Sequence, residues 1–218
     1  MIRAVLFDLD ETLHNRGQSL LSFLEAQYQE HFFGRCDIAA FIKKFISLDA
    51  NGSLPKFQLY PLLLRDLGII GLSASELAAD YNEHFYLHAK AMYQATETLA
   101  SLKALGKKLA IITNGPTEFQ QRTIKGIGLK TEFDAILISE TEGMRKPDPK
   151  IFLRATEKLS LKPEHCMFVG DNPEADVLGA HNAGLVAVWL ERSVKWPKDK
   201  DFVGKRISAL SEVLNLVS

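Results

Sequence analysis

Short apolar runs alternate with amphipathic segments over most of the chain. Five of these runs are brief, unalternated and bounded by turn residues: Ala4–Phe7, Leu109–Ile112, Ala135–Ile138, Met167–Val169 and Val186–Trp189. Runs of this kind are typical of strands that are buried on both faces of a sheet. The pattern therefore predicts a parallel β-sheet covered on both sides.

Helical segments lie between the predicted strands. They cover Thr96–Leu105, Glu118–Lys125, Pro149–Leu159, Glu174–Asn182 and Ser208–Leu216. Asp148 and Asn172 each precede a proline, which is the usual order of an N-cap and a first helical residue, and Pro116 occupies a first helical position in the same way. Strands that alternate with helices predict an α/β fold with helices on both faces of the sheet.

One long stretch breaks this alternation. Between about residues 15 and 92 the periodicity predicts only helices, at Leu20–Phe33, Ile38–Leu48, Phe57–Leu67 and Glu76–Ala91. Ser73 and Glu76 have the spacing of a capping box for the last of them. We expect a small helical domain, residues 15–92, inserted into a core of residues 1–14 and 93–218. Its interior is predicted to be aromatic, formed by Phe32, Phe33, Phe41, Phe45, Phe57 and Tyr60.

Composition narrows the functional classes. The 218 residues include 26 basic and 27 acidic side chains, so the net charge of -1 gives no broad basic field and no nucleic-acid partner is expected. No apolar run approaches the roughly 20 residues that span a bilayer, and Asp8 and Asp10 interrupt the apolar N-terminus before it could act as a signal peptide. Cys36 and Cys166 form no zinc motif. We therefore predict a cytoplasmic protein with no membrane partner, either a monomer or a homodimer.

The candidate chemistry lies where the predicted strands end. Ligands of an open α/β sheet bind outside the carboxyl ends of its strands. These ends carry Asp8-Leu9-Asp10, Thr113-Asn114-Gly115, the loop Arg145-Lys146-Pro147-Asp148, and Gly170-Asp171-Asn172 followed by Asp176. The sequence thus brings several carboxylates, a hydroxyl and an ammonium group to one edge of the sheet.

These groups suit phosphoryl transfer. Asp8 and Asp171 are hard oxygen ligands that can hold Mg²⁺, and the metal offsets the repulsion between a phosphate and the attacking Asp8 carboxylate. Lys146 and the Thr113 hydroxyl can bind phosphoryl oxygens, with backbone N–H groups after Thr113 as further donors. Asp10, two residues beyond Asp8, can act as general acid and then as general base, provided that a turn after Asp8 re-aims it.

Four motifs of the chain resemble those of a known family. Four motifs, Asp8-Leu9-Asp10-Glu11-Thr12-Leu13, Ile112-Thr113-Asn114-Gly115, Arg145-Lys146-Pro147-Asp148-Pro149 and Val169-Gly170-Asp171-Asn172 with Asp176, are similar in content and order to those of the haloacid dehalogenase-like (HAD) superfamily. The likeness is to its phosphatases with a helical cap of the C1 type. It covers about residues 1–14 and 95–190.

The resemblance implies a Rossmann-like core, a phosphoaspartyl intermediate on Asp8 and a Mg²⁺ cofactor. Asp10 would be the acid/base, with its backbone carbonyl on the metal. Phosphate would be bound by Thr113, Asn114 and Lys146, and the metal by Asp8, Asp10, Asp171 and Asp176, the last directly or through water. Asp10 favours phosphoryl transfer, because the dehalogenases proper lack the second aspartate. Glu11 replaces the glycine of many relatives, which raises a question about the local turn.

Substrate contacts are less well marked. His14 and His88 lie near the two expected crossovers, and Lys56 ends a predicted loop, Asn51–Lys56, between two helices. All three are candidate substrate residues, although an ordinary structural role is the simpler interpretation of each. His84 and His88 are spaced i, i+4 on one predicted helix, but with no third ligand nearby a zinc site is not expected.

The function expected from these features is that of a Mg²⁺-dependent phosphatase. Its substrate would be a small phosphorylated metabolite, such as a sugar phosphate or a nucleotide-like compound. A phosphomutase of the same fold is an alternative that the motifs do not separate from it. A non-enzymatic phosphoaspartate switch or binding protein is another, which the presence of Asp10 disfavours.

Overall fold

The computed structural model describes residues 1–129 and 133–217. The chain divides into two compact units: one is Met1–Arg16 with Lys90–Ser218, and the other is Gly17–Ala89. The sequence prediction had placed the inserted unit at residues 15–92. We call the first the core unit and the second the helical unit, and describe each by itself.

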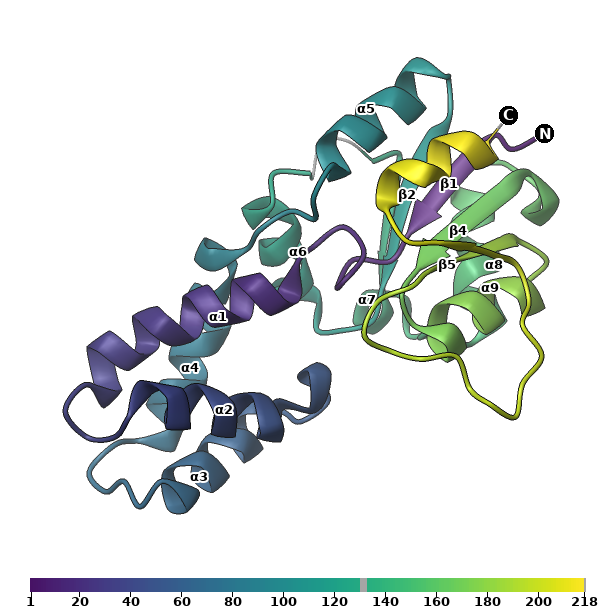
Figure 1. The fold of residues 1–218 in the computed structure, drawn as a ribbon. Coiled ribbons are helices and arrows are strands. Elements are labelled where there is room, and N and C mark those ends of the chain that lie inside the picture. The colour runs from purple at the N-terminus through teal and green to yellow at the C-terminus, as the bar shows by residue number, and fades with distance from the viewer. Residues whose placement is uncertain (130–132, 218) are drawn as a thin grey trace. The chain divides into compact units, whose positions relative to one another are not determined.

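The core unit contains one six-stranded parallel sheet, in the order β3-β2-β1-β4-β5-β6 (Figure 1). The strands are β1 (Ala4–Phe7), β2 (Lys108–Thr113), β3 (Ala135–Ile138), β4 (Cys166–Gly170), β5 (Val186–Leu190) and β6 (Lys205–Ile207). The five predicted strands and the α/β fold class are confirmed. β6 was missed because it is a three-residue edge strand whose first two residues are charged and exposed.

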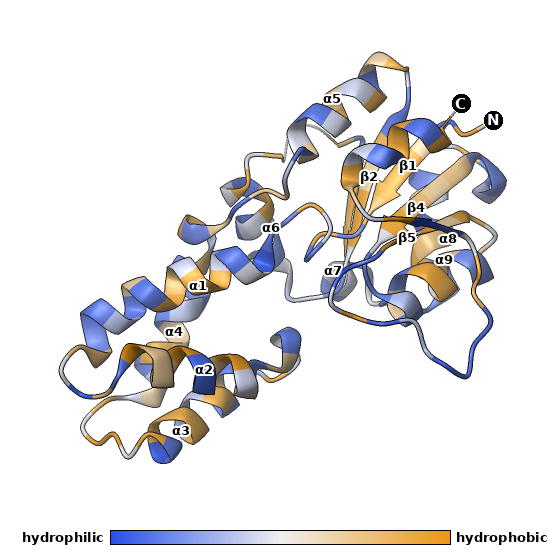
Figure 2. Ribbon diagram, in the orientation of Figure 1, coloured by the Kyte–Doolittle hydropathy of each residue, from blue (hydrophilic) through white to orange (hydrophobic). Residues whose placement is uncertain are grey.

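Strands β1, β2 and β4 are apolar and buried along nearly their whole length, as their orange ribbons in Figure 2 show, so both faces of the sheet have to be covered by helices. On one face, Leu6, Ile112 and Phe168 pack in a single cluster with Ile151 and Phe152 of α8 (Pro149–Lys158). Side chains that alternate with these along the strands, such as Val5 and Phe7, are also fully buried. The helices are α5 (Ala95–Ala104), α6 (Thr117–Gly126), α7 (Ser139–Glu142), α8 (Pro149–Lys158) and α9 (Gly179–Asn182).

Local capping signals were predicted with mixed success. Asp148 caps α8 by accepting the Lys150 N–H, and Asn172 accepts the N–H groups of Glu174 and Ala175. The helix after Asn172 begins as a π-helical turn, Pro173–Leu178, before it continues as α9. Pro116 is the N-cap of α6 rather than its first residue, since its ψ of 139° is extended. The predicted C-terminal helix is a 3₁₀ helix, Leu210–Leu216.

The helical unit consists of α1 (Arg16–Gln27), α2 (Ile38–Asp49), α3 (Lys56–Asp66) and α4 (Ala74–His84). A π-helical turn, Tyr28–Phe32, extends α1, and short 3₁₀ turns lie at Ala50–Gly52 and Phe85–His88. The predicted helix to Ala91 is therefore wrong beyond His84, and His84 and His88 do not share one α-helix. Ser73 caps α4 through the Glu76 N–H.

The aromatic interior of the helical unit is smaller than predicted. Phe32, Phe41, Phe45 and Tyr60 are fully buried, whereas Phe33 and Phe57 are 72% and 68% exposed. The exposed pair lies at helix ends, where a side chain can point away from the bundle. Within the part of the chain that the structure describes, every helix is too short or too polar to cross a membrane.

Candidate active site

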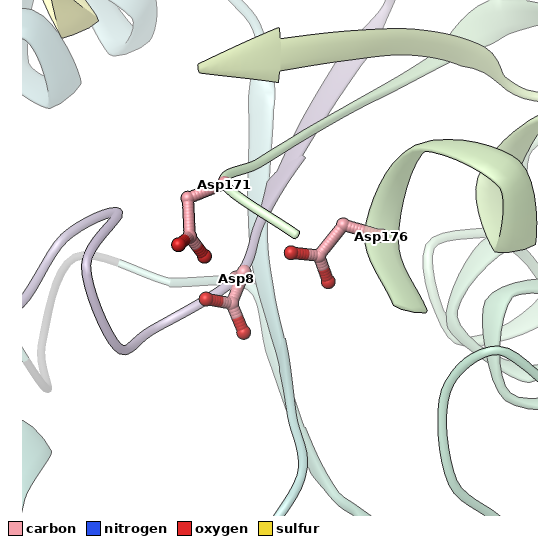
Figure 3. A group of neighbouring side chains, drawn as sticks. All are labelled: Asp8, Asp171 and Asp176. Carbon is pink, nitrogen blue, oxygen red and sulfur yellow. The ribbon is translucent and has the colours of Figure 1, made fainter. Parts of the chain in front are cut away.

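Three aspartates meet at the carboxyl edge of the sheet. Asp8 follows β1 and Asp171 follows β4, and these strands pair in register with Phe7 beside Val169. The third, Asp176, comes from the π-helical turn after β4. Figure 3 shows the three carboxylates pointing toward one another, and each offers an oxygen within 4.8 Å of the others. All three side chains are buried.

Lys146 supplies the positive charge of this cluster. Its Nζ lies 2.5 Å from Asp8 Oδ1 and 2.7 Å from Asp176 Oδ1. Although burial opposes its charge, Asp176 and Asp8 hold the pKa of Lys146 well above the ordinary value. Asn114 fixes the lysine from behind: its Nδ2 donates to the Lys146 carbonyl, and its Oδ1 accepts the Lys146 N–H, both at 2.9 Å. The Asn114 side chain thus binds the main chain of Lys146 through two hydrogen bonds.

The negative charge of the cluster is not balanced by Lys146 alone. Burial, opposed by Lys146 and reinforced by Asp176, raises the pKa of Asp8 to about 7. Burial and the charges of Asp8 and Asp176 raise the pKa of Asp171 to about 8. Among residues 1–129 and 133–217, no side chain or backbone N–H donates a hydrogen bond to the Asp171 carboxylate. Buried carboxylates without donors favour a bound cation, and an all-oxygen set fits a hard divalent ion.

Asp176 differs from Asp171 because both of its oxygens are already engaged. Oδ1 accepts from Lys146, and Oδ2 accepts the Asn172 N–H at 2.9 Å. Gly170 makes this arrangement possible, since a Cβ at that position would lie 2.4 Å from the Asp176 carboxylate. Asp176 therefore holds both the lysine and the loop that presents Asp171.

Asp10 occupies a separate position beside this cluster. The chain turns at Glu11, whose φ of 59° is left-handed, and the N–H groups of Leu13 and His14 both donate to the Leu9 carbonyl. This is the turn expected to re-aim Asp10, and it answers the question that Glu11 raised: glutamate is accommodated there in a conformation that glycine adopts at less cost.

The Asp10 carboxylate is held on both oxygens. His14 Nδ1 lies 2.7 Å from Oδ1, and Gln120 Nε2 donates to Oδ2 at 3.1 Å. Burial opposes ionisation, but the His14 hydrogen bond, the charges of His14 and Arg16 and the Gln120 hydrogen bond lower the pKa of Asp10 to about 2. The side chain remains 33% exposed. Asp10 is thus an ionised, accessible base in the resting protein.

His14 owes its position to the two connections between the units. The Met92 N–H donates to the Leu13 carbonyl and the Asn15 N–H to the Lys90 carbonyl, so the outgoing and returning segments pair beside Asp10. The His14 side chain is completely buried. Its Nδ1 contacts Asp10, and the prediction that His14 touches substrate remains untested.

The other predicted site residues fall in two places. Thr113 ends β2 with its hydroxyl 2.7 Å from Gln120 Nε2. Lys56 and His88 belong to the helical unit. Lys56 is not on a loop: it begins α3, is buried, and forms a 2.6 Å ion pair with Asp49. His88 Nδ1 lies 3.1 Å from the Ser22 hydroxyl. The residue that the sequence prediction missed is Gln120, for which no motif gave a signal.

The chain can now be compared with known proteins. A model of the haloacid dehalogenase-like hydrolases matches residues 2–184. A glyceraldehyde 3-phosphate phosphatase of Methanopyrus kandleri is 31% identical over 207 residues, 88% of this chain and 85% of that protein. A phosphoserine phosphatase of Thermus thermophilus is 37% identical over 131 residues, 59% of this chain and 52% of that protein.

A solved structure is similar over nearly the whole chain. The putative HAD-hydrolase YfnB from Bacillus subtilis, bound to magnesium, has a TM-score of 0.80 and 21% identity, covering 99% of this chain and 98% of that one. At this identity the likeness supports the fold. Together with the match over residues 2–184 and the aspartate cluster at the sheet edge, it confirms the resemblance drawn from the four motifs. The chain belongs to the haloacid dehalogenase-like hydrolases.

Proposed function

We propose that this protein is a Mg²⁺-dependent phosphatase that hydrolyses a small phosphorylated metabolite through a phosphoaspartate on Asp8. The observation that carries the proposal is the pairing of two different carboxylates. Asp8 is buried against Lys146 in an acidic cluster, and Asp10, two residues on, is separately held and ionised. One carboxylate inside the cluster and a second one held beside it by His14 and Gln120 are suited to the roles of nucleophile and acid/base.

The family and its phosphatase relatives make the chain a hydrolase of phosphoric monoesters. Glyceraldehyde 3-phosphate and phosphoserine, the substrates that the relatives' names give, are small alkyl phosphates. We propose a substrate of that size, a sugar phosphate or a nucleotide-like compound included.

Asp8 and Asp171 would hold Mg²⁺, together with the Asp10 carbonyl and with Asp176 directly or through water. When bound, the ion would neutralise charge between the cluster and the phosphoryl group. Lys146 and the Thr113 hydroxyl each bind a phosphoryl oxygen. The two hydrogen bonds from the Asn114 side chain to the Lys146 main chain keep the lysine in place.

In the first step, an Asp8 oxygen attacks phosphorus and the bond to the leaving oxygen breaks. The anionic phosphoryl group beside Asp10 raises the pKa of that carboxyl when substrate is bound, so Asp10 takes up a proton from solvent and gives it to the leaving oxygen. In the second step, Asp10 takes a proton from water, the water oxygen attacks phosphorus, and Asp8 is released with inorganic phosphate.

We further propose that the helical unit serves as the cap that excludes water during these steps, as the family resemblance implies. Deleting residues 17–89 and joining the connections with a short glycine–serine linker tests this role. The shortened enzyme is expected to hydrolyse a small aryl phosphate but to lose its preference among metabolites. An unchanged preference would contradict the proposed role of the cap.

The proposed reaction is tested by phosphate release from a panel of phosphorylated metabolites, with and without Mg²⁺. Asp8→Asn keeps the size of the side chain and removes the nucleophile, and Asp201→Asn makes the same change at an exposed position. We expect release that needs Mg²⁺, is abolished in the first variant and is unchanged in the second. Full activity of Asp8→Asn would exclude the proposed mechanism.

A further inference from the structure

Gln120 lies beneath the candidate acid/base and has no role in the scheme above. It belongs to α6 and is 2% exposed. Its Nε2 lies 2.7 Å from Thr113 Oγ1, 3.1 Å from Asp10 Oδ2 and 3.2 Å from the Asn114 carbonyl oxygen. A single amide group thus contacts two segments that carry predicted site residues, one at Asp10 and one at Thr113 and Asn114.

The orientation of this amide follows from its neighbours. The Asp10 carboxylate and the Asn114 carbonyl can only accept hydrogen bonds, so the nitrogen of Gln120 must face them. This leaves the Gln120 carbonyl oxygen buried, with no hydrogen-bond partner within the described ranges 1–129 and 133–217. A buried acceptor without a partner is unfavourable. The side chain keeps this orientation because its amide nitrogen donates hydrogen bonds to oxygens of Asp10, Thr113 and Asn114.

The contacts have a consequence for each partner. With His14 on Oδ1 and Gln120 on Oδ2, the Asp10 carboxylate is restrained at both oxygens. The Thr113 hydroxyl accepts from Gln120, so its own hydrogen is left to donate to another group. Of these contacts, the one to Asp10 is the one that bears on proton transfer to the leaving oxygen.

Room for this side chain is provided by Gly115. A Cβ at that position would lie 3.0 Å from Gln120 Cγ and 3.1 Å from its Cδ, so Gln120 would have to shift by a few tenths of an ångström. Alanine at position 115 would displace Gln120, and because the φ of Gly115 is 155° it would also strain the backbone beside Asn114. Gly115 is therefore needed for the close packing of Gln120.

We propose that Gln120 is a positioning residue that holds Asp10 in the orientation from which it protonates the leaving oxygen. The inference rests on the proposed function. It assigns to α6 a part in the first chemical step, although Gln120 does not touch the reacting atoms. Loss of its hydrogen bonds leaves Asp8, Lys146 and the acidic cluster in place but lets the Asp10 carboxylate rotate.

The test compares two leaving groups. An alkyl phosphate needs its leaving oxygen protonated, whereas p-nitrophenyl phosphate releases a stable phenolate and needs little help. The value of kcat/KM reports the first irreversible step for each. For Gln120→Met, which keeps the volume and removes the donors, we expect kcat/KM to fall about 10- to 100-fold on the alkyl substrate and less than about threefold on the aryl one.

Two further variants complete the design. Gln120→Leu, which also lacks the donors, is expected to show the same selective loss, and it serves if Gln120→Met does not fold. Gln121→Met makes the matched change at the next residue, which is exposed, and is expected to leave both values unchanged. An equal loss on both substrates, or no loss, in the folded variants at position 120 would overturn the inference. Wild-type protein that releases no phosphate would instead overturn the proposed function itself.

Discussion

Replacing Asp171 with asparagine is expected to stabilise the metal-free protein. Most substitutions of a buried polar residue have the opposite effect and destabilise the protein. Asp171 is 8% exposed, lies in a cluster with Asp8 and Asp176, and has its pKa raised from 3.8 to about 8. Without a cation, its negative charge in the folded state is opposed by burial and by two like charges. Asparagine removes that charge and keeps nearly the same shape.

The magnitude follows from linkage. A carboxyl whose pKa is higher in the folded than in the unfolded state binds more protons when folded, so its ionisation costs stability as pH rises from 3.8 to about 8. At about 1.4 kcal/mol per pKa unit, the interval from 3.8 to pH 7 corresponds to about 4 kcal/mol. Protonation of the folded cluster and movement of its neighbours relieve part of this cost. We expect Asp171→Asn to gain about 1–4 kcal/mol at pH 7.

Urea unfolding in the presence of EDTA, followed by tryptophan fluorescence, is the appropriate assay. Both tryptophans, Trp189 and Trp196, lie in the core unit, and Trp189 Nε1 donates to the Asp171 carbonyl at 3.0 Å. The signal therefore reports the unit that contains the site. The exposed control Asp201→Asn is expected to change stability by less than about 0.5 kcal/mol.

Two further observations belong to the same prediction. The free energy of unfolding of the metal-free wild type should fall between pH 4 and pH 8, and this slope should be smaller in Asp171→Asn. Mg²⁺ at a hundred times its Kd should stabilise the wild type by about 2.7 kcal/mol and the variant much less. If Asp171→Asn is less stable than the wild type in EDTA at pH 7, the reasoning about the uncompensated charge is wrong.

Three other variants test separate parts of the structure. Glu11→Gly removes a glutamate from the left-handed conformation, which relieves backbone strain but makes the unfolded chain more flexible. The free energy of urea unfolding should therefore change by less than about 1 kcal/mol, and kcat should be retained. A tenfold loss of kcat would contradict this expectation. Asp49→Asn removes the anionic partner with which the buried Lys56 ammonium forms its ion pair. Urea unfolding followed by far-UV circular dichroism should show that the free energy of unfolding falls by about 3–5 kcal/mol, and that adding Lys56→Met restores most of it. If Asp49→Asn alone leaves the free energy of unfolding unchanged, the ion pair with Lys56 does not contribute to stability as described. Gly170→Ala displaces Asp176 and with it Lys146, so phosphate release should slow about 100-fold; normal kinetics would show that the contact is not needed.

Much of the core could be predicted because parallel sheets leave strong local signals. Each strand that is buried on both faces is an uninterrupted apolar run, and its carboxyl end must lie beside those of its neighbours. This alone brought Asp8 and Asp171 to one edge. The caps at Asp148 and Asn172 were also predictable, because a side chain that accepts from the next turn depends only on local sequence.

What escaped prediction depends on contacts between distant segments. Gln120 looks like any polar helix residue, and its role is visible only when α6 packs against the ends of β1 and β2. Lys56 looks like a surface lysine, but the turn between α2 and α3 folds it back onto Asp49. His14 was singled out for its nearness to a crossover, and the pairing of the two connections then buried it against Asp10.

The central claim, that Asp8 carries the phosphoryl group, can be tested directly. The wild-type enzyme would be mixed with a substrate from the metabolite panel and Mg²⁺, quenched in acid within the first turnover, digested and examined by mass spectrometry. Asp8→Asn and a sample quenched after complete hydrolysis serve as controls. We predict one added phosphoryl group on the peptide that contains Asp8, present only in the early wild-type sample. Phosphate release with no adduct at any time, or an adduct on another residue, would contradict the account.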